Sequence, residues 1–164
     1  MCILELIYDI PFIGKPLFKM IVMFEGGPQE SESLRRLAKR KFKVEVGMFS
    51  YGDCFSNKFN NGGEVTIGMY CSFASSAVYF GGNHPMDHVS MSPYFYNKSF
   101  GMNERNIIKE KMTVGNDVWC EHNALIVSEC KELGNGTDIG AGSVVTKDAP
   151  VYAILLLLQG IQQK

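Results

Sequence analysis

The sequence predicts an all-β solenoid, a stack of short parallel strands connected by tight turns, and three observations indicate it. Between Val114 and Pro150 the chain repeats in units of six residues that begin with an aliphatic residue or, once, with cysteine. A period of six fits neither the 3.6-residue period of an amphipathic helix nor the two-residue period of a simple strand. Self-similarity at a short fixed period is typical of a coil in which one side chain per unit points inward. The first residues of these units are Val114, Cys120, Ile126, Leu133, Ile139 and Val145.

The N-terminal residues 1–43 precede the repeat and are expected to form a cap with a short basic helix. Ser31 or Ser33 can cap this helix, which should run to about Lys41 with leucines on its inner face. The helix is rich in lysine and arginine. This run is either a solvated helix face or a patch for an anionic acceptor or a membrane surface.

The β-helix domain is expected over residues 44–150, because the six-residue repeat is already present in weaker form at Val46, Ile67 and Phe73 before it becomes regular. Residues 79–112 interrupt it as a long inserted loop. This insertion is rich in aromatic residues and holds two of the three histidines, so we expect it to be ordered and functional.

The six-residue repeat is irregular at other places too. A shorter break runs from Gly52 to Glu64, and one extra residue at Glu132 predicts either a bulge or a local distortion of the coil. The six-residue repeat ends at Pro150, so residues 151–164 are expected to form an atypical C-terminal tail.

Composition limits the classes of partner and cellular location that the protein can be expected to have. A chain of 164 residues suits one domain, and a net charge of −1 argues against nucleic acid as the main partner. The five cysteines form no C-x-x-C pair, which indicates reduced, mostly buried thiols in a cytoplasmic protein. No stretch approaches the roughly 20 apolar residues of a membrane span, so no integral membrane contact is expected.

Several segments occur in the order and near the spacing of a known family: Ile67–Ser72, Gly82–Asp87, Ser92–Phe95, Val114–Trp119 and Ile139–Asp148. With them the chain resembles the xenobiotic acetyltransferase branch of the hexapeptide-repeat acyltransferases, which includes streptogramin and chloramphenicol acetyltransferases and related sugar O-acetyltransferases. The resemblance implies a left-handed parallel β-helix with three flat faces. It also implies acetyl transfer from acetyl-CoA, as a co-substrate, to a hydroxyl group.

The catalytic residues expected from this resemblance lie at the start of the insertion. Its Gly82–Asp87 segment resembles the family's catalytic loop, which implies that His84 is the general base, a role that suits an imidazole near neutral pH. Asn83, or a backbone N–H of a coil turn, could stabilise the oxyanion. Asp87 either orients the imidazole or caps the turn. We expect no acyl-enzyme, because nothing places a cysteine beside a base.

The cofactor site implied by the resemblance lies on the turns of the coil. Lys147 can meet the phosphates of acetyl-CoA as a point charge. Trp119 is expected either to lie near the cofactor or to pack at a corner of the coil. His122 is expected either to contact the cofactor or simply to face solvent. No metal is expected, because the sequence around His84 and His88 disfavours a helix and offers no third ligand. The predicted cofactor-binding residues are Trp119, His122, Ala141, Gly142, Thr146 and Lys147.

The acceptor is expected at aromatic residues of the insertion, chiefly Tyr94, Phe95 and Tyr96, because aromatic rings with polar tips suit stacking on a sugar. In the family this loop reaches a neighbouring subunit, which implies a homotrimer with three active sites between subunits. A saccharide or another small molecule is the expected acceptor.

The leading hypothesis is an acetyl-CoA-dependent O-acetyltransferase that modifies a sugar in surface polysaccharide biosynthesis. The second is an antibiotic O-acetyltransferase acting on streptogramin or chloramphenicol. The third is a non-catalytic β-helix scaffold. This last reading is favoured by the extra residue at Glu132 and by the segment after Tyr152, which lacks the Gly-x-Pro turn that helps hold coenzyme A in the family.

Overall fold

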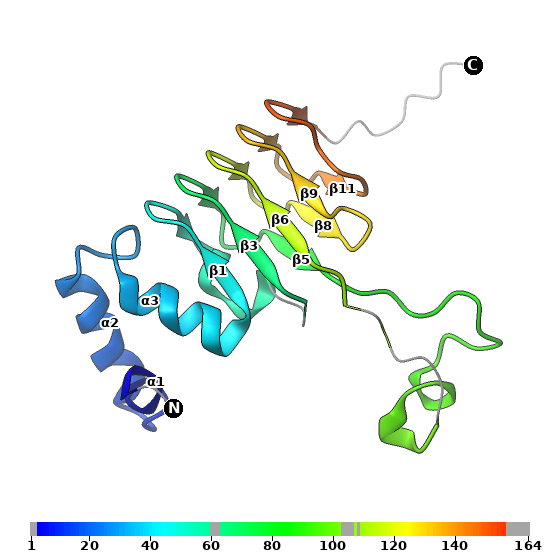
Figure 1. Cartoon of the computed structure of the whole chain (residues 1–164), viewed down its shortest axis with the longest axis horizontal. Coiled ribbons are helices and arrows are strands. Elements are labelled where there is room, and N and C mark those ends of the chain that lie inside the picture. The colour runs from blue at the N-terminus through cyan, green and yellow to red at the C-terminus, as the bar shows by residue number, and fades with distance from the viewer. Residues whose placement is uncertain (1–2, 60–62, 103–106, 108, 157–164) are drawn as a thin grey trace.

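The computed structural model describes residues 3–59, 63–102, 107 and 109–156 of the chain. They form a parallel β-helix with a helical cap at its N-terminal end (Figure 1). The first face contains β1 (Val44–Val46), β3 (Val65–Ile67), β6 (Met112–Val114) and β9 (Glu132–Leu133). The second contains β2 (Tyr51–Gly52), β4 (Ser72–Phe73), β7 (Trp119–Cys120), β10 (Asp138–Ile139) and β12 (Ile154–Leu155). The third contains β5 (Val78–Phe80), β8 (Leu125–Val127) and β11 (Val144–Val145).

The register of these strands places the first residues of the six-residue units, together with their pairing partners, in three buried columns. Residues that pair across strands stand directly above one another, so each column runs through successive coils. Burying one such aliphatic side chain stabilises the fold by about 1.5–3 kcal/mol. The predicted inward position of the first residue of each unit is therefore confirmed, and the structure also buries the fifth residue of each unit, such as Val118 and Ala124. The columns are Ile67, Val114 and Leu133; Phe73, Cys120 and Ile139; and Tyr79, Ile126 and Val145, each at most 4% exposed.

The extra residue is accommodated in the corner at residues 128–131, and Glu132 itself begins β9. Both β8 and β9 keep their register with the preceding coil, so of the two expected alternatives the structure has a local distortion, confined to this corner. The corner closes through a hydrogen bond from the Cys130 N–H to the Val127 carbonyl, and Cys130 itself is fully buried. One more residue thus widens the turn while the two flanking strands stay regular.

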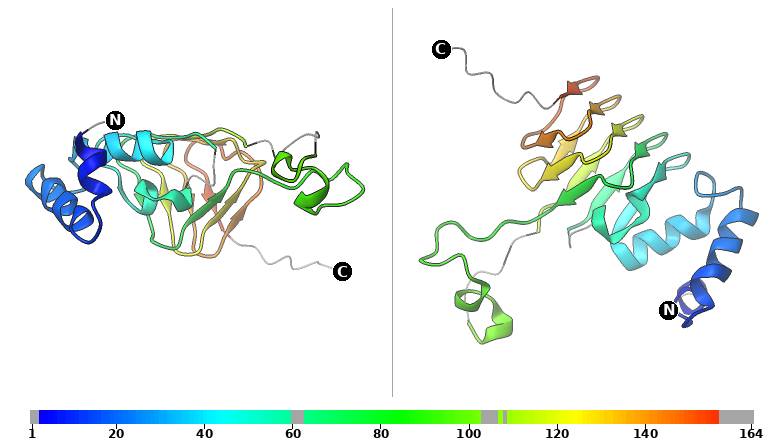
Figure 2. Two further views of the ribbon diagram at one scale, coloured as in Figure 1. Left: turned by 90° about the horizontal axis from the view of Figure 1, so that it is seen from below. Right: turned by 180° about the vertical axis from the view of Figure 1, so that it is seen from behind.

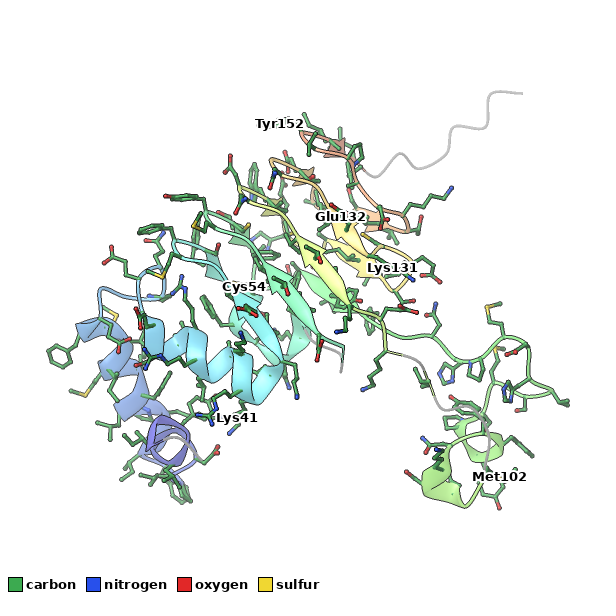
Figure 3. All side chains as sticks on the ribbon, in the orientation of Figure 1. Lys41, Cys54, Met102, Lys131, Glu132 and Tyr152 are labelled. Carbon is green, nitrogen blue, oxygen red and sulfur yellow. The ribbon has the colours of Figure 1, made fainter. Side chains whose placement is uncertain are left out.

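A carboxylate of the next coil holds this widened corner. Asp148 Oδ1 accepts hydrogen bonds from the N–H groups of Lys131 at 2.6 Å and Glu132 at 2.9 Å. These two bonds hold the pKa of the Asp148 carboxyl below its usual range. Figure 3 shows Lys131 at the corner that leads into β9 and Glu132 at the start of that strand. The extra residue is therefore accommodated by hydrogen bonds from two backbone N–H groups to the Asp148 side chain, and the strands on either side keep their register.

The break between Gly52 and Glu64 replaces the third-face strand of the first coil. Two short 3₁₀ turns follow β2 there, η2 (Asp53–Phe55) and η3 (Asn57–Phe59). Phe59 is fully buried, and its ring meets that of Phe73 edge-on with centroids 4.7 Å apart. Aromatic side chains thus close the core where a strand is missing.

The N-terminal cap is more helical than its sequence pattern alone indicated. It contains α1 (Ile3–Tyr8), α2 (Gly14–Phe24) and α3 (Glu32–Leu37), and a π-helical turn, η1 (Ala38–Phe42), continues α3. Ser31 is the N-cap of α3, because its hydroxyl accepts a hydrogen bond from the Leu34 N–H at 3.1 Å. Leu37 is buried against Phe18 and Val22 of α2. The structure thus has a capped helix here with Leu37 on its inner face, and it ends at Leu37, before the π-helical turn.

Within the basic run, Arg35 joins the cap to the first coil. Its guanidinium donates hydrogen bonds to backbone carbonyls on both sides, including those of Ser31 at 2.8 Å and Gly47 at 3.0 Å. Arg36, Lys39 and Lys41 form ion pairs with Glu32, Glu45 and Asp9, respectively. Much of the run is therefore used within the fold, which favours the solvated-face interpretation over an anion-binding patch.

At its C-terminal end, the coil includes one strand beyond Pro150, the residue at which the six-residue repeat ends. Strand β12 pairs in parallel with β10, so Ile154 and Leu155 belong to the second face. Residues 157–164 of the expected tail lie outside the described residues. Among the helices in the described ranges, none is both long enough and apolar enough to cross a membrane.

Candidate functional site

The long insertion leaves the third face after β5 and returns to the first face at β6. Its base is closed by a hydrogen bond from the Glu110 N–H to the Gly81 carbonyl at 2.8 Å. It carries two 3₁₀ turns, η4 (Pro93–Phe95) and η5 (Lys98–Phe100). Seen from three directions, the loop extends sideways from the coil and does not fold back onto it (Figures 1 and 2). Groups at its tip are therefore presented away from the chain's own coil.

His84 is exposed and is held through one of its two ring nitrogens. Its Nδ1 lies 2.7 Å from the hydroxyl of Tyr96, and the two rings meet edge-on with centroids 6.1 Å apart. The His88 ring contacts Tyr96 in a similar way at 5.9 Å. Because Nδ1 is engaged, Nε2 is the nitrogen of His84 that can meet an incoming group.

Asn83 and Asp87 have partners other than those the sequence suggested. The Asn83 side-chain amide donates to Glu129 Oε1 at 2.7 Å and so ties the start of the loop to a corner of the coil. Asp87 Oδ1 lies 3.9 Å from His88 Nε2. In this structure the partner of the His84 ring is therefore Tyr96, whereas Asp87, expected either to orient the imidazole or to cap the turn, lies beside His88.

The aromatic residues expected to bind the acceptor divide into two groups. Tyr94 and Phe95 are 63% and 52% exposed, and their rings pack edge-on at 5.6 Å. Tyr96 is fully buried, so it offers no ring face to an acceptor. Beside this group is a cavity of about 440 Å³ with a mixed polar and apolar lining. It is lined by Asp87, His88, Val89, Ser90, Phe95 and Met102.

Two of the expected cofactor residues line a second cavity at the C-terminal end of the coil. Thr146 and Lys147 follow β11, and both side chains are exposed. The cavity measures about 470 Å³ and combines apolar side chains with hydroxyl, ammonium and carboxylate groups. Such a lining fits a ligand that carries both an apolar arm and anionic phosphates. It is formed by residues 143–148 and 154–156.

His122, Ala141 and Gly142 lie at a corner between the second and third faces. The His122 carbonyl accepts a hydrogen bond from the Gly142 N–H at 2.9 Å, and its Nδ1 lies 2.9 Å from Ser76 Oγ. The Ala141 N–H donates to Glu121 Oε2 at 3.2 Å. Gly142 has a left-handed φ of 72° and open space where a side chain would point. The structure thus stacks these turns on one another, and it engages the N–H groups of both Ala141 and Gly142 within the coil.

Trp119 is 52% exposed on β7, so it is not packed into the core. Across the sheet it pairs with Asp138, a residue that the sequence analysis did not single out. Burial raises the pKa of the Asp138 carboxyl, and the nearby carboxylate of Glu121 raises it further. Only the sheet register brings Trp119 and Asp138 together, because 18 residues separate them in the sequence.

The candidate catalytic and cofactor residues lie on different parts of the molecule. His84 and its partners belong to the projecting loop, whereas Thr146 and Lys147 belong to the coil at β11 (Figure 1). Within one chain, His84 and the cavity beside Thr146 and Lys147 therefore lie apart.

Comparisons with known proteins agree with this architecture. No protein-family model matches the chain. A chloramphenicol acetyltransferase from Klebsiella aerogenes is 36% identical in an alignment 168 positions long, which covers 90% of this chain and 71% of that protein. Among solved structures, a maltose O-acetyltransferase from Clostridium difficile 630 matches with a TM-score of 0.53 and 18% identity, covering 85% of this chain and 79% of that one.

A second solved structure extends the comparison. A hexapeptide-repeat acetyltransferase from Vibrio cholerae O1 biovar eltor, determined in complex with acetyl coenzyme A, has a TM-score of 0.52 and 17% identity. The match covers 73% of this chain and 61% of that one. At these identities the two solved structures support the fold alone, and the sequence relative carries the evidence for family.

Proposed function

The chain belongs to the xenobiotic acetyltransferase branch of the hexapeptide-repeat acyltransferases, and we propose that it is an O-acetyltransferase that uses acetyl-CoA and His84 to acetylate a sugar hydroxyl. The observation that carries the role of His84 is its geometry: an exposed imidazole held at Nδ1 by a buried hydroxyl. Acetyl-CoA as co-substrate is supported by the Vibrio cholerae structure with that ligand. The left-handed sense of the coil is inferred from the family.

In the proposed reaction His84 Nε2 takes the proton of the acceptor hydroxyl while the hydroxyl oxygen attacks the carbonyl carbon of the thioester. The new C–O bond forms, the C–S bond breaks, and the proton on the imidazolium passes to the departing thiolate. Acetyl-CoA supplies an acyl group that is already activated, so the protein adds proton transfer and alignment. A positioned base of this kind contributes about 10²–10⁴-fold in rate.

Lys147 and Thr146 are the proposed cofactor contacts of the coil. The Lys147 ammonium would neutralise phosphate charge, and the hydroxyl of Thr146 can hydrogen-bond to the ligand. The cavity of about 470 Å³ beside them has room for part of a pantetheine arm. Trp119 and His122 would border the same ligand along the coil. Ala141 and Gly142 would contribute through their carbonyl groups, because their N–H groups are already engaged.

We infer a homotrimer in which the loop of one subunit meets the coil of the next. The sideways extension of the loop and the separation of the two sets of residues support this arrangement (Figure 2). Mixing two inactive variants tests it. If His84→Ala and Lys147→Ala chains are co-expressed, about one quarter of the interfaces should combine both intact residues and regain activity under random assembly. No recovery in mixed oligomers would place the site within one chain.

The decisive test of the base is kinetic. His84→Ala should lower turnover by at least about 10²-fold, while calorimetric titration should give an unchanged affinity for acetyl-CoA. Lys98→Ala, an exposed cation on the same loop, is the matched control and should keep turnover within about two-fold of wild type. Turnover of His84→Ala within a few-fold of wild type would remove His84 from the mechanism.

A second candidate acceptor is an antibiotic hydroxyl, and the relative from Klebsiella aerogenes favours it by its name. Exposed rings such as Tyr94 and Phe95 suit a flat drug as well as a sugar. Expression in a sensitive host separates the two proposals. Raised tolerance of chloramphenicol or streptogramin would support the antibiotic reading. Unchanged tolerance together with acetylation of a saccharide in an acceptor screen would support the sugar reading.

A further inference from the structure

Tyr96 differs from the other aromatic residues around it in the loop. Tyr94, Phe95 and Phe100 are all more than half exposed, whereas Tyr96 is fully buried. It is buried although the loop extends away from the coil, so its cover comes from the loop itself. The rings of His84 and His88 pack edge-on against it, with centroids 6.1 and 5.9 Å away. A tyrosine enclosed in this way has one defined position.

We propose that Tyr96 is a positioning residue for the base: its hydroxyl accepts a hydrogen bond from His84 Nδ1–H and thereby fixes both the ring orientation and the tautomer of His84. The proposal rests on the proposed function of His84, and it changes the predicted role of Tyr96 from substrate contact to support of the imidazole. The distance of 2.7 Å between the hydroxyl oxygen and Nδ1 carries it.

The direction of this hydrogen bond follows from what a base requires. A neutral imidazole has a proton on one nitrogen and a lone pair on the other. If the tyrosine hydroxyl donated to Nδ1, the proton of His84 would reside on Nε2, and Nε2 could not accept a proton from the acceptor. If the hydroxyl accepts from Nδ1–H, the lone pair lies on the outward Nε2.

The accepting arrangement is also compatible with the protonated ring. When His84 has taken a proton, both nitrogens are donors, and Nδ1–H can keep the same bond to Tyr96. The hydrogen bond therefore persists through proton transfer without rotation of the hydroxyl. Because Asp87 faces His88, the structure assigns this supporting role to a neutral hydroxyl.

Nitrogen-15 NMR of histidine-labelled protein measures this tautomer directly. The chain has three histidines, so single His→Gln variants assign the signals. In the wild-type protein His84 should be the Nδ1–H form at a pH where it is neutral. In Tyr96→Phe, which removes only the hydroxyl and keeps the ring between the two histidines, the signals should move toward the Nε2–H form. Tyr70→Phe, an exposed tyrosine on the coil, should leave them unchanged.

Kinetics provide the second readout. Tyr96→Phe should lower kcat by about 10-fold, equivalent to about 1.4 kcal/mol of transition-state stabilisation, with the KM for acetyl-CoA unchanged. A purely structural role would instead lower thermal stability or disturb the His88 signals. An Nε2–H tautomer of His84 in the wild-type protein would overturn the proposal without any variant. So would an unchanged tautomer in a folded Tyr96→Phe protein.

The two proposals can fail separately. The tautomer is measured without acceptor or acetyl-CoA, so it does not depend on the reaction. If His84→Ala retains turnover, the proposed base is lost whatever the tautomer. If His84→Ala is inactive but Tyr96→Phe keeps both tautomer and kcat, His84 remains the base and Tyr96 is only packing.

Discussion

The coil and the projecting loop are built in different ways, although both carry candidate site residues. In the coil every strand pairs with the strand above or below it, and inward side chains are almost completely buried. In the described part of the loop between Gly82 and Lys111, Tyr96 is the only residue that is buried. The comparison indicates that the proposed cofactor residues stand on a self-supporting frame. The proposed base, His84, stands on a segment whose order depends on a few contacts.

This difference has a thermodynamic consequence. Segments with few buried apolar contacts open locally at lower free energy than a packed core does. We therefore expect substitutions in the coil to change global stability, and substitutions in the loop to change mainly the reaction. The following predictions test this separation from the largest expected effect to the smallest.

Removing an inward side chain of the coil should have the largest effect. Ile126 is fully buried in the third-face column, and Ile126→Ala leaves a cavity that should cost about 2–5 kcal/mol of unfolding free energy. The matched loop variant Val89→Ala, at a fully exposed position, should stay within about 0.5 kcal/mol of wild type. Denaturation in urea measures both. Equal losses would mean that the loop is packed as firmly as the coil.

Two glycines with positive φ sharpen the same comparison. Gly52 in the coil has φ 97° and ψ −152°, a region open almost only to glycine, and an added Cβ would lie 1.8 Å from the Phe73 carbonyl oxygen. Gly52→Ala should therefore cost about 2–3 kcal/mol, from strain and from displacement of backbone. Gly101 in the loop has φ 79° and open space around it, so Gly101→Ala should cost about 1 kcal/mol, confined to the loop.

Thermal unfolding together with hydrogen exchange distinguishes these two outcomes. Gly52→Ala should lower the midpoint temperature of the whole protein. Gly101→Ala should leave that midpoint nearly unchanged and should raise exchange only in the loop. A large global loss in Gly101→Ala would contradict the independence of the two regions.

The smallest effect concerns the pH dependence of the widened corner. The folded-state pKa of Asp148 is depressed by the N–H groups of Lys131 and Glu132, so its contribution is present above the unfolded value of about 3.9 and is lost as the pH falls through the folded pKa. Wild type should therefore lose more stability than Asp148→Asn between about pH 5 and pH 3. Parallel pH profiles would mean that the carboxylate contributes nothing at this corner.

The corners between the first and second faces show that glycine is an incomplete sequence signal for left-handed turns in this fold. Five residues at equivalent places between the first and second faces have positive φ, and only one of them is glycine. The turn requires the left-handed conformation, and packing between coils imposes it on bulky side chains. The rings of the first two stack at 5.2 Å. Sequence reasoning missed this corner because its usual signal is absent. The residues are Phe49, Tyr70, Asp117, Gly136 and Tyr152.

Most of the coil could be predicted from the sequence, whereas the arrangement of the site could not. Thr146 and Lys147 were assigned through the family resemblance, whereas the six-residue repeat predicted only that Val145 before them faces inward. For His84 the sequence suggested Asp87, three residues away, as one of two alternatives, whereas the structure pairs His84 with Tyr96. No period relates residues in an irregular loop, so neighbours in sequence are poor guides to neighbours in space.

The sequence by itself determined that the first residue of each six-residue unit faces inward, because burial of apolar side chains imposes a fixed period on any chain that coils in this way. It also determined that His84 lies in a segment outside that period. Only the tertiary structure decided that Tyr96 supports His84 and that Asp148 closes the corner at Glu132. Both are hydrogen bonds between residues at least 12 positions apart, and their formation depends on the path of the backbone rather than on any local pattern.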